Sequence, residues 1–122
     1  MPRTRVVIYR AGDGSSPFVD WFGDLPAKAK DKVMVRLRRL RELGHELRRP
    51  EADYLRDEIY ELRTSFRGAH YRVLYFFHGN VAAIVAHGLT KERQVPNRDI
   101  DIAIRRKLEF EANPENHTKE EI

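Results

Sequence analysis

The chain has 122 residues, of which 41% are hydrophobic and 34% charged, with a net charge of +4 and no cysteine. This size and composition predict one soluble, cytoplasmic domain with a single hydrophobic core. The lack of cysteine excludes disulfides and thiolate metal sites. No apolar run approaches the length of a membrane span, and no leader pattern is present.

The charges are distributed unevenly along the chain. Residues 28–49 carry nine Lys or Arg against three Asp or Glu, whereas residues 109–122 carry five Glu against one Lys. A basic body with an acidic tail favours a polyanionic partner such as nucleic acid, although the same charges could simply form a solvated surface. We expect a domain over residues 1–112 and an acidic C-terminal tail over residues 113–122.

The first third of the chain predicts one strand and two helices. Residues 5–9 form a short apolar run that ends at a Gly- and Asp-rich turn. Ser16-Pro17 then offers a helix start, and four apolar residues follow at helical spacing: Phe18, Trp21, Phe22 and Leu25. A second helix is predicted over residues 27–43, closed by Gly44. Its polar face carries a cationic ridge made of Lys28, Lys32, Arg36, Arg39 and Arg41.

The rest of the chain predicts a loop, three strands and a helix. Residues 45–57 are polar and contain Pro50, so we expect a loop there. Strands are predicted over residues 59–66, 69–78 and 81–87, and the last two should pair antiparallel through the turn at residues 78–80. A final helix should begin near Asn97. The fold class is therefore α+β: one domain with a small, antiparallel-dominated sheet, covered by two N-terminal helices and followed by a C-terminal helix.

Most common catalytic patterns are missing from the sequence. The five histidines show no metal-ligand spacing, no serine lies in a nucleophile elbow, and no Gly-rich phosphate loop is present. We therefore expect no metal and no cofactor.

A group of cationic residues remains as the candidate site. Arg72 lies inside the predicted central strand, Arg63 lies on the neighbouring strand, and Lys91 and Arg93 follow the last strand. If the strands pair in order, these side chains meet at one rim of the sheet. There, guanidinium groups could bind phosphate and stabilise a pentacoordinate transition state. The alternative to phosphate binding is structural pairing of these arginines with Glu61, Glu58 or Asp57. For Arg63 the two stay open, because Glu61 shares its strand face, whereas for Arg72 we favour a functional role. His70 and His87 are the nearby groups that could transfer protons near neutral pH.

Several segments around these residues resemble one toxin family. They are DEIYELR at residues 57–63, YRVLY at 71–75, HGLTKE at 87–92 and VP at 95–96. Together they are similar to the phage Gp49-like, HigB-type branch of the RelE/ParE toxin superfamily, over roughly residues 6–110.

The resemblance implies the toxin of a type II toxin–antitoxin pair with a RelE-like fold. Such toxins cut messenger RNA on the ribosome without a metal: the RNA 2′-OH attacks the neighbouring phosphate, a 2′,3′-cyclic phosphate is left, and translation stops. Arg72, Lys91 and Arg93 are the implied catalytic residues, with His87 as a candidate base. Arg63, His70, Arg36 and Arg39 are expected to bind RNA. The implied partners are the ribosome, messenger RNA and a small, HigA-like helix-turn-helix antitoxin.

Two departures from RelE leave the general base open between His87 and His70. Glu61 stands where RelE has lysines, and residues 95–97 replace the tyrosine that RelE carries near its last helix. Two alternative functions also stay open. One is a ParE-like inhibitor that binds DNA gyrase without cutting RNA, and the other is a degenerate phage protein that only binds its antitoxin.

Overall fold

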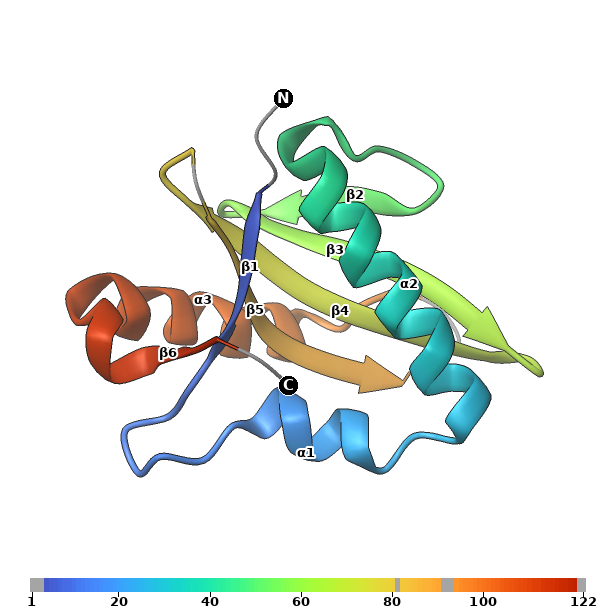
Figure 1. Cartoon of the computed structure of the whole chain (residues 1–122), viewed down its shortest axis with the longest axis horizontal. Coiled ribbons are helices and arrows are strands. Elements are labelled where there is room, and N and C mark those ends of the chain that lie inside the picture. The colour runs from blue at the N-terminus through green and yellow to red at the C-terminus, as the bar shows by residue number, and fades with distance from the viewer. Residues whose placement is uncertain (1–3, 81, 91–93, 121–122) are drawn as a thin grey trace.

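The computed structural model describes residues 4–80, 82–90 and 94–120. In this part of the chain six strands form one mixed sheet in the order β2-β3-β4-β5-β1-β6, together with three α-helices (Figure 1). The strands are β1 (Arg5–Tyr9), β2 (Ala52–Arg56), β3 (Ile59–Phe66), β4 (Ala69–His78), β5 (Ala82–Thr90) and β6 (Thr118–Lys119). The helices are α1 (Pro17–Gly23), α2 (Ala27–Leu43) and α3 (Asn97–Ala112), with short 3-10 turns at Gly44–Glu46 and Pro114–His117.

The strand pairing confirms an α+β domain with an antiparallel-dominated sheet. Strands β2, β3, β4 and β5 pair antiparallel in sequence order, and β1 joins the far side of β5 in parallel. The three predicted central strands are present. The last of them extends to Thr90, beyond the expected end, and its expected first residue, position 81, lies outside the described residues.

Two strands of the sheet were missed, β2 and the two-residue β6. The prediction of a loop over residues 45–57 is wrong, because β2 lies there and pairs with β3 from Ala52↔Leu62 to Arg56↔Ile59. This edge strand has only five residues and begins two positions after Pro50, so the sequence around it read as a polar loop rather than as an alternating strand.

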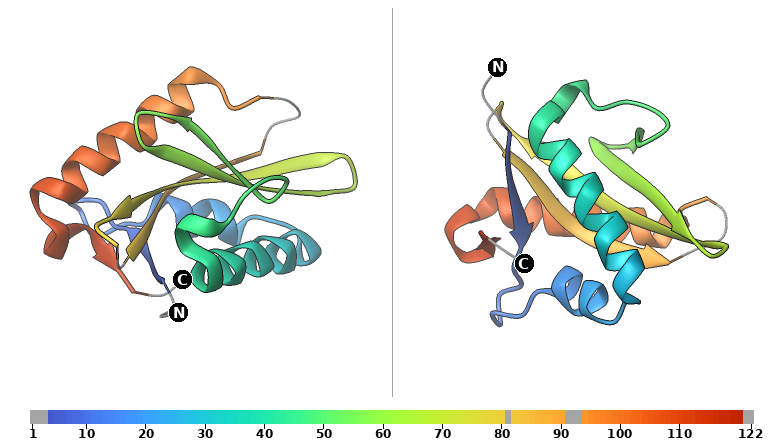
Figure 2. Two further views of the ribbon diagram at one scale, coloured as in Figure 1. Left: turned by 90° about the horizontal axis from the view of Figure 1, so that it is seen from above. Right: turned by 45° about the vertical axis from the view of Figure 1, so that its right-hand side comes forward.

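The two N-terminal helices cover one face of the sheet as predicted, and the C-terminal helix covers the other face. Helices α1 and α2 lie on one side and α3 lies on the other, as the view from above shows (Figure 2). Two hydrophobic clusters follow from this arrangement. Phe18, Val33 and Leu40 pack against one face, and Ile100, Ala103 and Phe110 pack against the other. Strand β4 is apolar on both faces because it contributes to both clusters.

The segment after α3 is ordered as far as it is described, which differs from the loose tail that the sequence suggested. The Arg10 amide donates to the His117 carbonyl at 2.8 Å, and the His117 ring stacks on Tyr9. Strand β6 then pairs antiparallel with β1. The domain boundary at residue 112 remains a prediction. None of the helices in the described ranges is long and apolar enough to cross a membrane.

Candidate functional site

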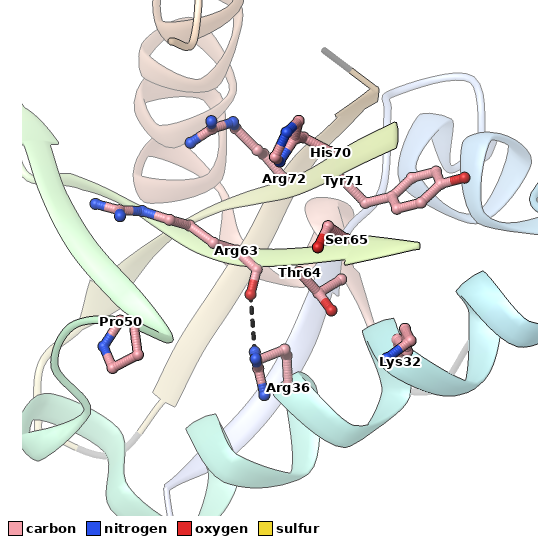
Figure 3. A pocket seen from close by; sticks show the side chains of 9 residues that line it. All are labelled: Lys32, Arg36, Pro50, Arg63, Thr64, Ser65, His70, Tyr71 and Arg72. Carbon is pink, nitrogen blue, oxygen red and sulfur yellow. Dashed lines mark hydrogen bonds between the residues drawn. The ribbon is translucent and has the colours of Figure 1, made fainter. Parts of the chain in front are cut away.

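Two arginines lie directly opposite each other on neighbouring strands. The register of β3 and β4 pairs Arg63 with Arg72. Strand alternation places both on the face that α3 covers, together with Leu74 and Phe76 of β4. Their side chains extend in the same direction, as Figure 3 shows. Like charges directly across a strand pair repel each other, so this arrangement requires a counter-charge.

Glu61 supplies that counter-charge. It lies two residues before Arg63 on the same face of β3 and is only 2% exposed. Its Oε1 atom accepts a hydrogen bond of 2.6 Å from Arg63 Nε and another of 2.6 Å from Arg72 Nη1. The alternative of structural pairing with Glu61 is therefore present for both arginines. One buried carboxylate holds two guanidinium groups in fixed orientations.

A second carboxylate extends this network toward the edge of the sheet. Asp53 of β2 accepts a 2.7 Å bond from Arg63 Nη2 and also pairs with Arg49 at 2.8 Å. Hydrogen bonding to Arg49 lowers the pKa of the Asp53 carboxyl. Among the described residues, three guanidinium groups thus share these two carboxylates. Sequence reasoning missed Arg49 and Asp53 because it did not place a strand at residues 52–56.

Two hollows adjoin the arginine pair, and Arg63 and Arg72 line both. The first, of about 280 Å³, is also lined by Lys32, Arg36 and His70, and no carboxylate lines it among the described residues (Figure 3). The second, of about 600 Å³, lies toward the start of α3 and also includes Arg49, Arg56 and Asn97. Below, these are called the hairpin hollow and the α3 hollow. Both linings are rich in cationic side chains, and the α3 hollow also includes Asp53 and Glu61.

The cationic ridge of α2 is partly engaged in structural contacts. Arg36 Nε donates to the Arg63 carbonyl at 2.8 Å, which ties α2 to β3 at the hairpin hollow. Arg39 forms a bidentate pair with Glu51, in which Nε donates to Oε2 at 3.0 Å and Nη2 donates to Oε1 at 3.1 Å. This contact lowers the pKa of the Glu51 carboxyl. Of the two predicted RNA-binding residues on this helix, only Arg36 lines the hairpin hollow.

His87 lies on the α3 face but has partners at both ring nitrogens. Its Nε2 lies 2.8 Å from Asp99 Oδ1 and its Nδ1 lies 3.1 Å from Arg106 Nη1. Because a guanidinium only donates, Nδ1 accepts and Nε2–H donates to the Asp99 carboxylate. Burial lowers the pKa of the imidazole below its ordinary value. This contact network favours a neutral, structural histidine.

The remaining predicted residues divide into one that is described and two that are not. His70 of β4 lies two residues before Arg72, half-buried, and lines the hairpin hollow beside it. Lys91 and Arg93 lie outside the described residues. Across residues 4–80, 82–90 and 94–120, no group of three or more acidic or histidine side chains is arranged to hold a metal ion.

Comparison with known proteins assigns the chain to a family. A search of curated proteins found no match. The family model described as "Phage derived protein Gp49-like" matches residues 20–108, which contain α1 from Asp20 onward, α2, strands β2 to β5 and most of α3. This family is associated with the toxins of toxin–antitoxin systems. Because the match spans well over half of the chain, the protein belongs to the phage-derived Gp49-like family, a family of RelE/HigB-type toxins.

Proposed function

We propose that the protein is the toxin of a type II toxin–antitoxin pair that stops translation by cutting messenger RNA on the ribosome. The observation that carries this proposal is the cross-strand pair of Arg63 and Arg72, fixed by Glu61 between two hollows. Fixed guanidinium groups bind a phosphate through two parallel N–H donors, and they stabilise the charge that develops when a nucleophile adds to it.

The proposed reaction needs only the RNA and protein side chains. The ribose 2′-oxygen attacks the adjacent phosphorus, the O2′–P bond forms, and the P–O5′ bond breaks. The products are a 2′,3′-cyclic phosphate and a 5′-hydroxyl end. One proton leaves the 2′-OH and one reaches the departing 5′-oxygen. We propose His70, which lines the hairpin hollow, as the group that transfers them.

The proposed roles follow from position. Arg72 and Arg63 hold the scissile phosphate, and Arg36 binds RNA at the hairpin hollow. Arg39, one turn further along α2, contacts the RNA backbone beyond it. Lys91 and Arg93 remain proposed catalytic cations on the basis of the sequence. His87 is the weaker candidate for the base, because Asp99 and Arg106 occupy both of its ring nitrogens.

The proposed partners are the ribosome with its bound messenger RNA, in the cytoplasm, and a small helix-turn-helix antitoxin. The family association with toxin–antitoxin systems supports an antitoxin partner. A neighbouring reading frame that encodes a small helix-turn-helix protein, and that relieves growth arrest when it is co-expressed, would support this pairing. Failure of every adjacent gene product to bind the purified protein would contradict it.

Primer extension on messenger RNA after induction tests the function in cells. We expect codon-spaced cuts with the natural protein and none with Arg72→Ala, whereas Arg105→Ala should cut normally because this exposed α3 residue lines neither hollow. Intact transcripts together with DNA damage would instead indicate a gyrase inhibitor. Intact transcripts and normal growth would indicate a protein that only binds its antitoxin.

A further inference from the structure

Tyr54 is an unusually exposed aromatic residue for the middle of a strand. Its side chain belongs to β2 and is 47% exposed, whereas Tyr75 of the central strand β4 is fully buried. An exposed aromatic ring on a sheet edge has apolar surface to offer to a ligand.

The ring of Tyr54 is nevertheless held in place. Its centroid lies 5.1 Å from that of Tyr60 in an edge-to-face contact, and its hydroxyl accepts a 3.1 Å hydrogen bond from the Glu58 amide. Tyr60 in turn contacts Phe77 at 5.3 Å, and so connects Tyr54 to the hydrophobic core. A ring fixed at both ends loses little conformational entropy when a ligand stacks on it.

A third hollow, of about 490 Å³, lies beside this ring. It is lined by Leu47, Arg48, Arg49, Ala52, Asp53, Tyr54 and Tyr60. Arg49, Asp53 and Tyr54 also line the α3 hollow, so the two hollows are adjacent across the edge strand β2. Tyr54 pairs with Tyr60 and therefore lies on the α2 face of the sheet, opposite to the face of Arg63 and Arg72. An extended strand of RNA held at the arginine pair would reach Tyr54 by passing around the edge strand β2 along Arg49.

We infer that Tyr54 stacks on an unpaired nucleobase of the RNA whose phosphate Arg63 and Arg72 hold, with Arg49 contacting the intervening backbone. The inference rests on the proposed function and adds a base-binding subsite to it. Single-stranded nucleic acids are commonly bound by a cationic groove joined to aromatic rings, because every base has a π-face whatever its sequence. The arginines and tyrosines of the adjoining hollows provide both components.

Binding of a fluorescently labelled single-stranded RNA, measured by anisotropy at low salt, tests this subsite. Two oligonucleotides are compared: one intact, and one with abasic ribose at its central positions. Tyr54→Ala should weaken binding of the intact RNA by roughly 10-fold, as expected for the loss of one base–aromatic stack. It should leave binding of the abasic RNA unchanged, because no base is present to stack.

Three further variants separate stacking from a structural effect. Tyr54→Phe should bind like the natural protein because it keeps the ring, whereas Tyr54→Leu should bind intact RNA as weakly as Tyr54→Ala. Val35→Ala, at an exposed apolar residue of α2, should have no effect on either RNA. Circular dichroism should show that all variants remain folded.

The outcomes distinguish failure of the subsite from failure of the proposed function. Arg63→Ala should weaken binding of both RNAs, because it removes a phosphate contact. If Tyr54→Ala weakens the binding of both RNAs equally, or of neither, the base-binding subsite is wrong. Messenger RNA cleavage by the natural protein would still support the proposed function. A Tyr54→Ala defect in antitoxin binding alone would instead assign this surface to a protein partner. If the natural protein neither binds RNA nor cuts messenger RNA, both the proposed function and the Tyr54 subsite are wrong.

Discussion

Glu61 is the residue that makes the arginine pair possible. A carboxylate that is 2% exposed carries a large desolvation cost, and two guanidinium groups at 2.6 Å compensate for it. Without this carboxylate, Arg63 and Arg72 would repel each other across the strands. The side chain of Arg72 is only 14% exposed, so little solvent would screen that repulsion.

Removing Glu61 should therefore be costly. We expect Glu61→Ala to lower the free energy of unfolding by about 3 kcal/mol, since it leaves two partly buried cations without their shared partner. Urea denaturation measures this change. The matched control is Asp101→Ala, which removes an exposed partner of Arg56 and should cost far less, because solvent screens this pair. Equal losses in the two variants would show that Glu61 does not hold the pair.

At the residue scale, the sequence allowed part of the site to be predicted. Glu61 and Arg63 are two positions apart in a strand, so their shared face followed from strand alternation, and their pairing was one of two alternatives that the structure then showed. Asp53 was not predictable in the same way, because its contact with Arg63 depends on an edge strand whose sequence reads as a loop. The partners of His87 come from α3, and their approach depends on how that helix packs on the sheet.

Strand β5 and helix α3 are joined by the buried Asp99 together with the half-buried His87 and Arg106. Arg106 also donates to the Ala86 carbonyl at 2.9 Å, so the helix contacts both the backbone and a side chain of β5. The helix in turn forms one wall of the α3 hollow through Asn97 and Ile100. The position of this wall relative to Arg63 and Arg72 depends on these contacts.

The protonation of His87 should make stability depend on pH. Burial lowers its pKa in the folded protein below the ordinary value of 6.5, so the unfolded chain takes up a proton first as the pH falls. The stabilisation from neutral His87 is complete above about pH 6.5 and is lost as the pH decreases from there toward the folded pKa. Urea midpoints at pH 7.5 and pH 5.5 should differ more for the natural protein than for His87→Gln. An identical pH dependence in both proteins would contradict this assignment.

Helix α1 contacts β5 through a close approach at one glycine. A Cβ atom at Gly88 would fall within the ring of Trp21, whose Nε1 donates to Thr90 Oγ1 at 3.3 Å. Because the backbone and the indole ring leave no room there, the absence of a side chain at residue 88 lets α1 lie against the sheet.

Gly88→Ala should therefore move Trp21 and destabilise the domain by about 1–3 kcal/mol, the usual range for overpacking. Fluorescence of the single tryptophan should change at the same time, and urea denaturation measures the loss. Gly12→Ala is the control, since nothing lies within 4 Å of its added Cβ. The same stability in both variants would show that the contact with Trp21 can relax freely.

At the element scale, the helices and central strands were predictable because their apolar spacing is regular. Helix α2 matches its expected range of residues 27–43, with Val33, Leu37 and Leu40 buried. The parallel pairing of β1 with β5 was not predictable, because nothing local to residues 5–9 specifies a partner that far along the chain. Covering of both sheet faces likewise depends on where α3 packs, which its own periodicity does not determine.

In the whole molecule, two hydrophobic layers cover the faces of the sheet, and cationic side chains gather near the β3–β4 pair. The sheet lies between α3 on one side and α1 with α2 on the other (Figure 2), and the two described hollows that contain Arg63 and Arg72 meet at the β3–β4 pair. Several arginines there are held by carboxylates, including Glu51, Asp53 and Glu61. These pairs fix guanidinium positions, which favours a specific phosphate site over a diffuse basic surface.

Cleavage of ribosome-bound messenger RNA by the purified protein tests the central claim most directly. The natural protein should produce fragments that end in a 2′,3′-cyclic phosphate and a 5′-hydroxyl. Arg72→Ala should cut about 10²- to 10³-fold more slowly, the usual effect of removing one donor to a developing charge, while Arg105→Ala keeps the natural rate. Uncut messenger RNA with the natural protein, or cutting at the natural rate with Arg72→Ala, would contradict the assignment of phosphate chemistry to the arginine pair.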